Sequence, residues 1–364
     1  MTPTTDVPAL NVGVMGVTIA IDPEDHVTRS RLAAQWSRAT VSELEAPVSG
    51  RVGADTGPTQ SAHARDYAVA TQVTLAALRA TAGERYNLHA GGLADDDGRV
   101  LAVVAPSGTG KTTATRLLAE RLGYVSDETV SITPDGVVYP HAKPLSVITD
   151  PTLPGRKEQL SPDALGLRPT PTCGRLARIV VLRRGVPHPR GLVRVPTLDG
   201  LLHLIEQSSS VVEARDPLLT LLSLVETAGG VWMLEYDEID QHVEELEAFL
   251  ASEVAVLDDP VAARHLGDPH AQLVDAAADT LQRLPWVDAI ELHGEVLVLL
   301  PARAVKLDNL MATAWLELSV PRTLDELAVA AEAEHGAHPD ARALVREAIA
   351  VMVEQHLVVW GALA

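Results

Sequence analysis

The chain has 364 residues, 46% of them hydrophobic, and its 49 acidic against 29 basic residues give a formal net charge of −20. This length allows two domains with separate cores, and the acidic balance argues against sequence-independent binding to nucleic acid or to an anionic membrane surface. The single cysteine, Cys173, excludes an internal disulfide, and its default interpretation is a buried structural thiol.

The first informative segment is Leu88–Gly92, which contains His89 and precedes a turn at Asp95–Gly98. An apolar run, Val100–Val104, follows the turn and predicts a buried strand. His89 alone is either a hydrogen-bonded core histidine or a residue of an active site, and the segment itself leaves both open.

A glycine-rich turn follows that strand directly and leads into a segment with leucines at helical spacing. This order is the context of a P-loop. Gly108 and Gly110 allow backbone N–H groups to turn towards phosphate oxygens, Lys111 reaches the β- and γ-phosphates, and Thr112 is a ligand for Mg²⁺. We therefore expect ATP and Mg²⁺ as cofactors. The residues expected at the nucleotide are Ser107, Gly108, Thr109, Gly110, Lys111, Thr112 and Thr113.

One position of the loop departs from the consensus, because Ala105 stands where the first glycine is usual. A glycine-rich turn before an ordinary helix is therefore the alternative. The use of lysine favours the P-loop. The chain contains only four lysines, Lys111, Lys143, Lys157 and Lys306, and otherwise uses arginine.

Two adjacent acids, Asp127 and Glu128, end the next apolar segment. Asp127 lies 16 residues after Lys111 (127 − 111), which leaves room for one helix and the start of a strand. A carboxylate this near the loop is placed to act on the transferring phosphate. One acid accepts a proton from an attacking hydroxyl and the other holds Mg²⁺. The alternative is an acidic turn that caps a strand.

Further elements follow in α/β order. Lys143 is either a positive charge for phosphate or acceptor, or a solvated loop lysine. Residues 151–172 are rich in proline and predict a loop or flap over the site. The remaining predicted elements are a central strand at 175–182, a helix at 197–207, a strand at 229–236 and a helix at 239–250. Arg178, Arg183 and Arg184 flank the central strand, and they either neutralise phosphate or cap a sheet edge.

Three of these pieces, taken together, resemble the HPr kinase/phosphorylase family, which shares its fold with phosphoenolpyruvate carboxykinases. They are His89 before the strand, the loop Ser107–Thr112, and the paired acids Asp127 and Glu128. The resemblance implies that Asp127, His89 and Lys111 are catalytic, with Asp127 in proton transfer, and that Glu128 and Thr112 form the metal site. Glu128 stands where that family usually has aspartate, so the resemblance supports phosphoryl chemistry more than it supports HPr as the acceptor.

The pattern weakens between residues 256 and 280, and we place the linker there, between domains at 1–255 and 281–364. Beyond it, Asp288–Leu292, Glu295–Leu300 and Arg303–Leu307 predict three short antiparallel strands. Three helices then follow. Asn309 caps the first, Thr323 and Glu326 form a capping box for the second, and Asp340 caps the third.

Three strands followed by three helices form a small α+β domain that resembles PqqD and related precursor-recognition elements. The similar pieces are Val305–Asn309, Ala314–Trp315, Thr323–Leu327 and Gln355–Val358. The resemblance implies that a leader peptide adds as a strand to the sheet edge. The alternative is a winged-helix-like structural or dimerisation domain.

The sequence thus predicts a two-domain α/β protein: an HPr kinase/phosphoenolpyruvate carboxykinase-like P-loop domain fused to a PqqD-like winged-helix domain. We expect an ATP-dependent kinase for a hydroxyl of a peptide or protein, with ribosomal peptide natural-product biosynthesis as a setting. One alternative is a nucleotide-gated adaptor that binds a precursor peptide without catalysis, and the other is a kinase for HPr or a small metabolite. We expect a cytoplasmic protein with no nucleic-acid or membrane partner, and homo-oligomerisation is left open.

Overall fold

The structure is a computed structural model. It describes residues 7–41, 47–54, 61–106, 108–148, 157–254, 263–266 and 276–361. Ser107, one of the expected nucleotide residues, lies outside the described residues. The chain forms two compact units, the first comprising residues 1–215 and 223–256 and the second residues 216–222 and 257–364.

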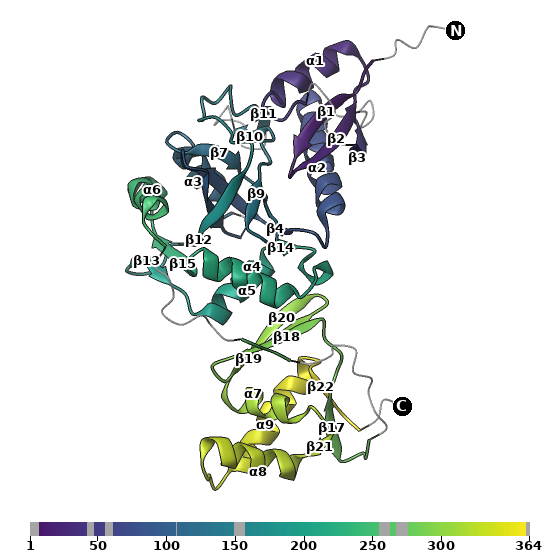
Figure 1. The fold of residues 1–364 in the computed structure, drawn as a ribbon, viewed down its shortest axis with the longest axis vertical. Coiled ribbons are helices and arrows are strands. Elements are labelled where there is room, and N and C mark those ends of the chain that lie inside the picture. Colours follow the sequence, from purple (N-terminus) through teal and green to yellow (C-terminus); the bar gives the residue numbers. More distant parts are fainter. Residues whose placement is uncertain are drawn as a thin grey trace, which may run out of the picture. The chain divides into compact units, whose positions relative to one another are not determined.

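A central sheet organises the first unit, and the described part of the chain supplies ten strands to it (Figure 1). Its main path runs β14-β4-β8-β9-β12-β6-β5-β7, with β15 beside β12 and β13 beside β15. The strands are β4 (Tyr86–Leu88), β5 (Ala90–Ala94), β6 (Arg99–Val104), β7 (Gly123–Ser126), β8 (Val130–Ile132), β9 (Val137–Tyr139), β12 (Gly174–Arg184), β13 (Gly191–Arg194), β14 (Ser208–Ser209) and β15 (Val231–Tyr236). The three strands expected at 100–104, 175–182 and 229–236 are confirmed as β6, β12 and β15, which run parallel.

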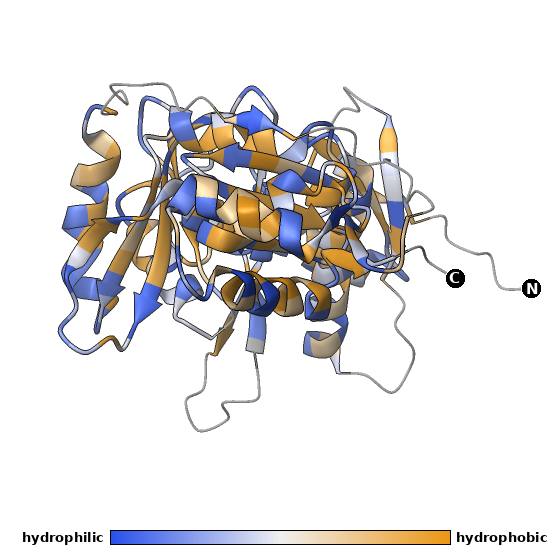
Figure 2. Ribbon diagram, turned by 90° about the horizontal axis from the view of Figure 1, so that it is seen from below, coloured by the Kyte–Doolittle hydropathy of each residue, from blue (hydrophilic) through white to orange (hydrophobic). Residues whose placement is uncertain are grey.

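Helices cover both faces of this sheet. Alternate residues of a strand point to opposite faces. Leu234 of β15 packs in a cluster with Leu118 and Leu246, whereas Val231 lies against Gly200 on the other face. The helices are α3 (Lys111–Leu118) and α6 (Val243–Ala251) on the first face, and α4 (Thr197–Glu206) on the second. In Figure 2 the strands carry long hydrophobic stretches, and hydrophilic residues gather at their ends and turns.

The N-terminal part of the first unit has its own small sheet, in the order β1-β2-β3, and its own apolar core around Trp36. Its elements are β1 (Leu10–Val14), β2 (Val17–Asp22), α1 (His26–Gln35), β3 (Val48–Gly53) and α2 (Ala62–Thr81). A separate antiparallel pair, β10 (Leu145–Ile148) and β11 (Lys157–Leu160), follows the central strands. The loop or flap expected at 151–172 therefore includes a strand, since β11 pairs with β10, while residues 151–156 lie outside the described ranges.

The second unit contains a sheet in the order β16-β18-β19-β20 and a smaller sheet in the order β21-β17-β22. Its strands are β16 (Arg264–His265), β17 (Thr280–Arg283), β18 (Asp288–Leu292), β19 (Glu295–Leu300), β20 (Arg303–Leu307), β21 (Arg322–Thr323) and β22 (Val358–Trp360). Its helices are α7 (Asn309–Glu317), α8 (Leu324–His335) and α9 (Ala341–Glu354), and α5 (Pro217–Thr227) begins in this unit and ends in the first. The three expected antiparallel strands are confirmed as β18, β19 and β20.

Helix starts in the second unit agree with the sequence in part. The capping box of Thr323 and Glu326 is confirmed at α8, where each residue bonds the backbone of the other. Asp308, not Asn309, is the N-cap of α7, because Asn309 already begins the helix. Asp340 is the N-cap of α9, but its side chain makes no capping hydrogen bond.

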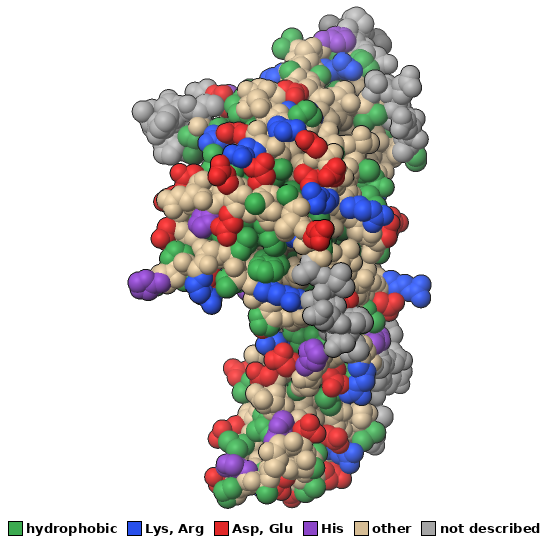
Figure 3. Space-filling model, turned by 60° about the vertical axis from the view of Figure 1, so that its left-hand side comes forward, with side chains coloured by type: hydrophobic (Ala, Val, Ile, Leu, Met, Phe, Trp, Pro, Cys, Tyr) green, Lys and Arg blue, Asp and Glu red, His purple; other side chains and the backbone are tan. Residues whose placement is uncertain are grey.

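Three further observations concern the surface, the cysteine and the helices. In the face shown in Figure 3, acidic and basic side chains are interspersed. Cys173 is exposed, so the expectation of a buried thiol is wrong, because the residue lies just before β12 and not within it. Among the described residues, no helix is both long and apolar enough to cross a membrane.

Candidate active site

The glycine-rich loop has the backbone that a phosphate-binding loop requires. Gly108 and Gly110 have φ values of 86° and 95°, a region that favours glycine, and α3 begins directly at Lys111. The Tyr236 hydroxyl donates to the carbonyl of Thr109 over 2.8 Å and so holds the loop from β15. The Thr109 hydroxyl donates to the carbonyl of Pro106 over 2.7 Å. The role of Tyr236 has no signal in the sequence beyond its place at the end of a strand.

The position of α3 depends on a second glycine, in β5. A Cβ at Gly91 would lie 2.0 Å from the Thr115 hydroxyl oxygen, so only glycine allows this approach. That hydroxyl donates to the carbonyl of Lys111 over 2.9 Å. The backbone of β5 therefore contacts the helix that carries Lys111, and it fixes the depth at which the lysine enters the site.

Lys111 is buried, with 7% of its surface exposed, and its Nζ donates to the carbonyl of His89 over 3.1 Å. Burial lowers the pKa of Lys111 to about 8, and the nearby carboxylates of Asp127 and Glu128 oppose that shift. Among the residues that the structure describes, Lys111 has no carboxylate within ion-pair distance. Its charge is therefore available to an anionic ligand.

The paired acids lie in the same cavity and contact the second scarce lysine. Lys143 Nζ lies 3.1 Å from Asp127 Oδ1 and 3.3 Å from Glu128 Oε2. The Tyr124 hydroxyl also donates to Asp127 Oδ1, over 3.0 Å. The Ser126 hydroxyl accepts from the backbone N–H of Glu128 and so shapes the turn between the acids and β7. The acids thus face inward, and the alternative of a strand-capping acidic turn does not describe Asp127, which is 6% exposed.

Lys143 is 6% exposed, so the alternative of a solvated loop lysine is wrong. Burial lowers the pKa of Lys143, but the carboxylates of Asp127 and Glu128 outweigh that effect and raise it above its usual value. Burial, reinforced by the charge of Asp127, also raises the pKa of Tyr124 well above its ordinary range. Lys143 therefore stays charged, and Tyr124 stays a neutral hydrogen-bond donor.

Two histidines flank these groups. His89 is half-buried, and burial together with the charge of Lys111 lowers its pKa, so the ring is neutral at pH 7. His141 is buried, and burial lowers its pKa to about 3. The Thr74 hydroxyl donates to the carbonyl of Ala70, so His141 Nε2 donates to that hydroxyl over 3.0 Å. His141 thereby ties α2 to the segment that carries Lys143, a role without a sequence signal.

Lys111, Lys143 and the two acids border one cavity of about 520 Å³. The expected site residues that line it are His89, Gly108, Gly110, Lys111, Thr112, Thr113, Asp127 and Glu128. Thr109 lies on the loop but borders a neighbouring cavity. The structure thus brings together His89, the loop and the acids, which are separated in the sequence by a helix and several strands.

Other residues of the cavity come from elements that carry no motif. Tyr67, Ala70 and Thr71 line it from α2, and Ser146 and Gln159 line it from the β10–β11 pair. Gln159 Nε2 donates to the Ser146 hydroxyl over 2.6 Å, which joins the two strands at the cavity wall. Only the tertiary fold identifies these residues, because nothing in their local sequence marks them.

The donor set fits a magnesium ion that arrives with a nucleotide. Thr112 and the half-buried Glu128 line the same cavity. Within the described ranges there is no group of three or more histidine, cysteine or acidic side chains that would hold a metal by itself. Mg²⁺ commonly takes one or two protein ligands and completes its shell with phosphate oxygens and water. Glu128 and Thr112 are the residues that would hold it.

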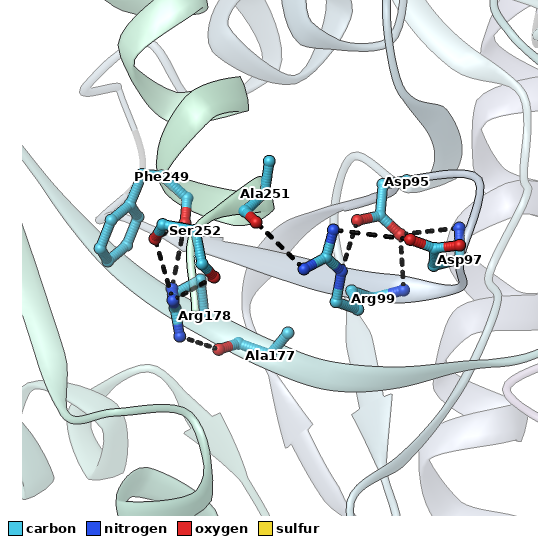
Figure 4. Close-up of polar contacts among 8 residues, drawn as sticks. All are labelled: Asp95, Asp97, Arg99, Ala177, Arg178, Phe249, Ala251 and Ser252. Carbon is cyan, nitrogen blue, oxygen red and sulfur yellow. Dashed lines mark hydrogen bonds and ion pairs between the residues drawn. The ribbon is translucent and has the colours of Figure 1, made fainter. Parts of the chain in front are cut away.

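The arginines of β12 have different roles at the two ends of the strand. Arg178 is buried, and its guanidinium donates to the carbonyls of Phe249 and Ser252 at the end of α6, over 3.1 and 2.7 Å (Figure 4). Arg178 therefore neither neutralises phosphate nor caps a sheet edge, but satisfies helix C-terminal carbonyls. At the other end, Arg183 and Arg184 border the neighbouring cavity, which Thr109 of the glycine-rich loop also lines.

Comparisons with known proteins give little beyond this geometry. No protein-family model matches the chain, and no curated protein matches it. Among solved structures, the chain is similar to the Hpr(Ser) kinase/phosphatase from Coxiella burnetii, at 12% identity and a TM-score of 0.28. That match covers 46% of this chain and 99% of the other.

Proposed function

We propose that this protein is an ATP-dependent phosphotransferase that phosphorylates a hydroxyl group. One observation carries the proposal: a buried carboxylate, Asp127, lies in the same cavity as the loop lysine Lys111. A glycine-rich loop also binds nucleotide phosphates in many proteins that only hydrolyse the nucleotide or change conformation when they bind it. A buried carboxylate beside the loop adds a group that can take a proton from an attacking hydroxyl.

The proposed reaction requires few groups. The acceptor hydroxyl oxygen forms a bond to the γ-phosphorus of ATP while the bond from that phosphorus to the bridging oxygen of ADP breaks. The hydroxyl proton passes to Asp127, and Lys111 stabilises charge on the β- and γ-phosphates. Magnesium, when bound, supplies further neutralisation of the phosphate charge.

Lys143 and Tyr124 position Asp127 in this scheme. Both contact Oδ1, at 3.1 and 3.0 Å, so among the described residues Oδ2 is the oxygen left to accept the proton. His89 is neutral and half-buried, and its carbonyl receives Lys111 Nζ. Its backbone therefore orients the lysine, and its ring borders the space between the loop and the acids.

We further propose that the acceptor is a peptide or protein recruited by the second unit. The support is the order of three antiparallel strands and three helices, and the place of β20 at the end of its sheet in the described part of the chain. A strand that pairs on one side leaves backbone groups for an added peptide strand on the other. The sequence resemblance to precursor-recognition elements points the same way, towards a leader peptide.

The test uses the full chain, Mg-ATP and synthetic candidate peptides that contain hydroxyl side chains, including any short peptide that neighbouring genes encode. We expect ADP release and a peptide mass increased by one phosphoryl group, both absent in Lys111→Ala. Mass spectrometry of the peptide decides the acceptor. ADP release with an unmodified peptide would mean that water accepts the phosphoryl group, and it would contradict the peptide acceptor. ATP-dependent peptide binding without ADP release would contradict catalysis and favour the adaptor.

A further inference from the structure

A second cavity, of about 470 Å³, borders the nucleotide loop. Thr109 of the loop lines this cavity, whereas Gly108 and Gly110 line the first. Asp127 and Lys143 line the first cavity and do not line this one. The two cavities also meet at a backbone hydrogen bond, in which the N–H of His89 donates to the carbonyl of Gln207 over 2.6 Å. The loop thus lies between two spaces with different linings.

The second cavity lies at the carboxyl ends of parallel strands. Its floor includes Val181 of β12 and Met233 of β15, which are direct partners in the sheet. Val181 also pairs with Val104 of β6, the last residue of the strand before the loop. In open α/β sheets, ligands bind in the crevice outside these strand ends.

We propose that the second cavity binds the purine nucleoside of the nucleotide whose phosphates lie on the loop. This inference rests on the proposed function, because it assumes that a nucleotide binds there. A nucleotide held by the loop has two ends. Its terminal phosphate must reach Asp127 in the first cavity for transfer to occur, so its nucleoside lies on the side of the loop where Thr109 is.

The lining suits a flat heterocyclic ring with polar edges. Val181 and Met233 supply apolar contact, and the guanidinium of Arg183 lies over the thioether, with Nη1 4.0 Å from Met233 Sδ. A guanidinium in this place stacks on an aromatic base. Glu206 and Gln207, from the end of α4, offer a carboxylate and an amide at the rim for the hydrogen-bonding edge of the base.

In this arrangement the two substrates, nucleotide and acceptor, occupy different parts of the two cavities. The nucleoside takes the second cavity, and the part of the first cavity between α2 and the β10–β11 pair remains for the acceptor. Tyr67 and Thr71 on one side and Ser146 and Gln159 on the other are the residues that border this remaining space.

The test compares Mg-ATP with Mg-tripolyphosphate, which carries the phosphates without a nucleoside. Calorimetry measures both affinities in the wild type, Arg183→Ala and Arg190→Ala. Arg183 and Arg190 both pair with Glu235, at 3.6 and 2.9 Å, but only Arg183 lines the cavity, so Arg190→Ala is a matched control. We expect Arg183→Ala to weaken the affinity for Mg-ATP about tenfold, because the stacking contact is lost. The affinity for Mg-tripolyphosphate should stay within roughly twofold of the wild-type value. Arg190→Ala should leave both unchanged.

A second variant, His203→Trp, places a larger ring from α4 at the cavity wall and so fills part of the proposed nucleoside space. It should also weaken the affinity for Mg-ATP about tenfold and leave the affinity for Mg-tripolyphosphate unchanged. Equal weakening of ATP and tripolyphosphate by Arg183→Ala would assign that arginine to the phosphates and overturn the proposal. Unchanged ATP affinity in His203→Trp would place the nucleoside elsewhere and overturn it while the loop assignment stands. If the wild type binds neither compound, the proposed function fails together with the nucleoside site.

Discussion

The two ends of the first cavity each contain a buried lysine, and the two lysines have opposite electrostatic environments. At the loop end, burial lowers the pKa of Lys111 to about 8, and its hydrogen bond goes to a backbone carbonyl. At the acid end, the carboxylates of Asp127 and Glu128 raise the pKa of Lys143 in spite of its burial. The charge of Lys111 is thus available to an anionic ligand, whereas the charge of Lys143 is already neutralised by carboxylates of the protein.

This difference between the two lysines suggests separate roles in nucleotide binding and in phosphoryl transfer. A buried cation without a carboxylate partner favours the arrival of phosphate, because the ligand supplies the missing negative charge. A cation that already contacts two carboxylates positions them and adds little net attraction for an anion. We therefore expect changes at the loop end to act on nucleotide affinity, and changes at the acid end to act on transfer and on folding stability.

The largest expected effect is on transfer, in Asp127→Asn. The amide keeps the shape of the side chain but cannot accept the proton, so the rate should fall on the order of 10²- to 10⁴-fold. Affinity for Mg-ATP should stay within roughly twofold, because Asp127 lies at the acid end and Lys111 is unchanged. Single-turnover kinetics and calorimetry measure the two quantities. A variant that transfers phosphate at nearly the wild-type rate would show that the base is another group, with His89 the next candidate.

A large effect on folding is expected in Lys143→Met, which leaves Asp127 buried without its cation. Breaking a buried pair from one side costs about 3–5 kcal/mol of the free energy of unfolding, which urea denaturation measures. The matched control is Lys306→Met in the second unit, where Lys306 pairs with Glu295 at 3.3 Å in a more exposed place. We expect that control to cost no more than about 1 kcal/mol.

The double variant Lys143→Met/Asp127→Asn sharpens this prediction. Removing both charges should restore part of the loss, because no buried carboxylate remains unpaired. Strictly additive losses in the double variant would mean that Lys143 stabilises the fold through packing and not through Asp127.

The smallest expected effect is a pH dependence of nucleotide affinity. Lys111 must be protonated to bind phosphate, and bound phosphate raises its pKa, so binding takes up a proton above pH 8. Affinity for Mg-tripolyphosphate should therefore be constant just below pH 8 and fall by up to about tenfold for each unit above it. Lys111→Arg keeps its charge at these pH values and should give a flatter curve. Equal slopes for wild type and variant would assign the titration to another group.

The sequence predicted those parts of the fold that depend on neighbouring residues. The strand, loop and helix around Lys111 were predicted because glycine spacing and apolar runs are local signals, and the capping box at Thr323 was predicted for the same reason. The short spacing between the loop and the acids was also interpreted correctly. One helix and one strand fill the interval between Lys111 and Asp127.

Other parts of the site depend on contacts between distant segments. Tyr67 and Gln159 reach the cavity only because α2 and the β10–β11 pair lie beside it, and neither belongs to a motif. Lys143 and Arg178 looked alike in the sequence, as single cations near strands, and only burial and partners distinguish them. Lys143 contacts a carboxylate of the first cavity, whereas Arg178 contacts helix carbonyls far from the loop in sequence.

The close approach of Gly91 to Thr115 has a consequence for interpreting natural and engineered variants. Gly91 is 20 residues before Lys111 (111 − 91) and does not line the cavity. An alanine there would nevertheless displace Thr115 and, through its bond to the carbonyl of Lys111, the helix turn that carries the lysine. A survey that scores only residues near the ligand would class Gly91→Ala as silent. The substitution nevertheless changes the position of Lys111, as a change in the loop would.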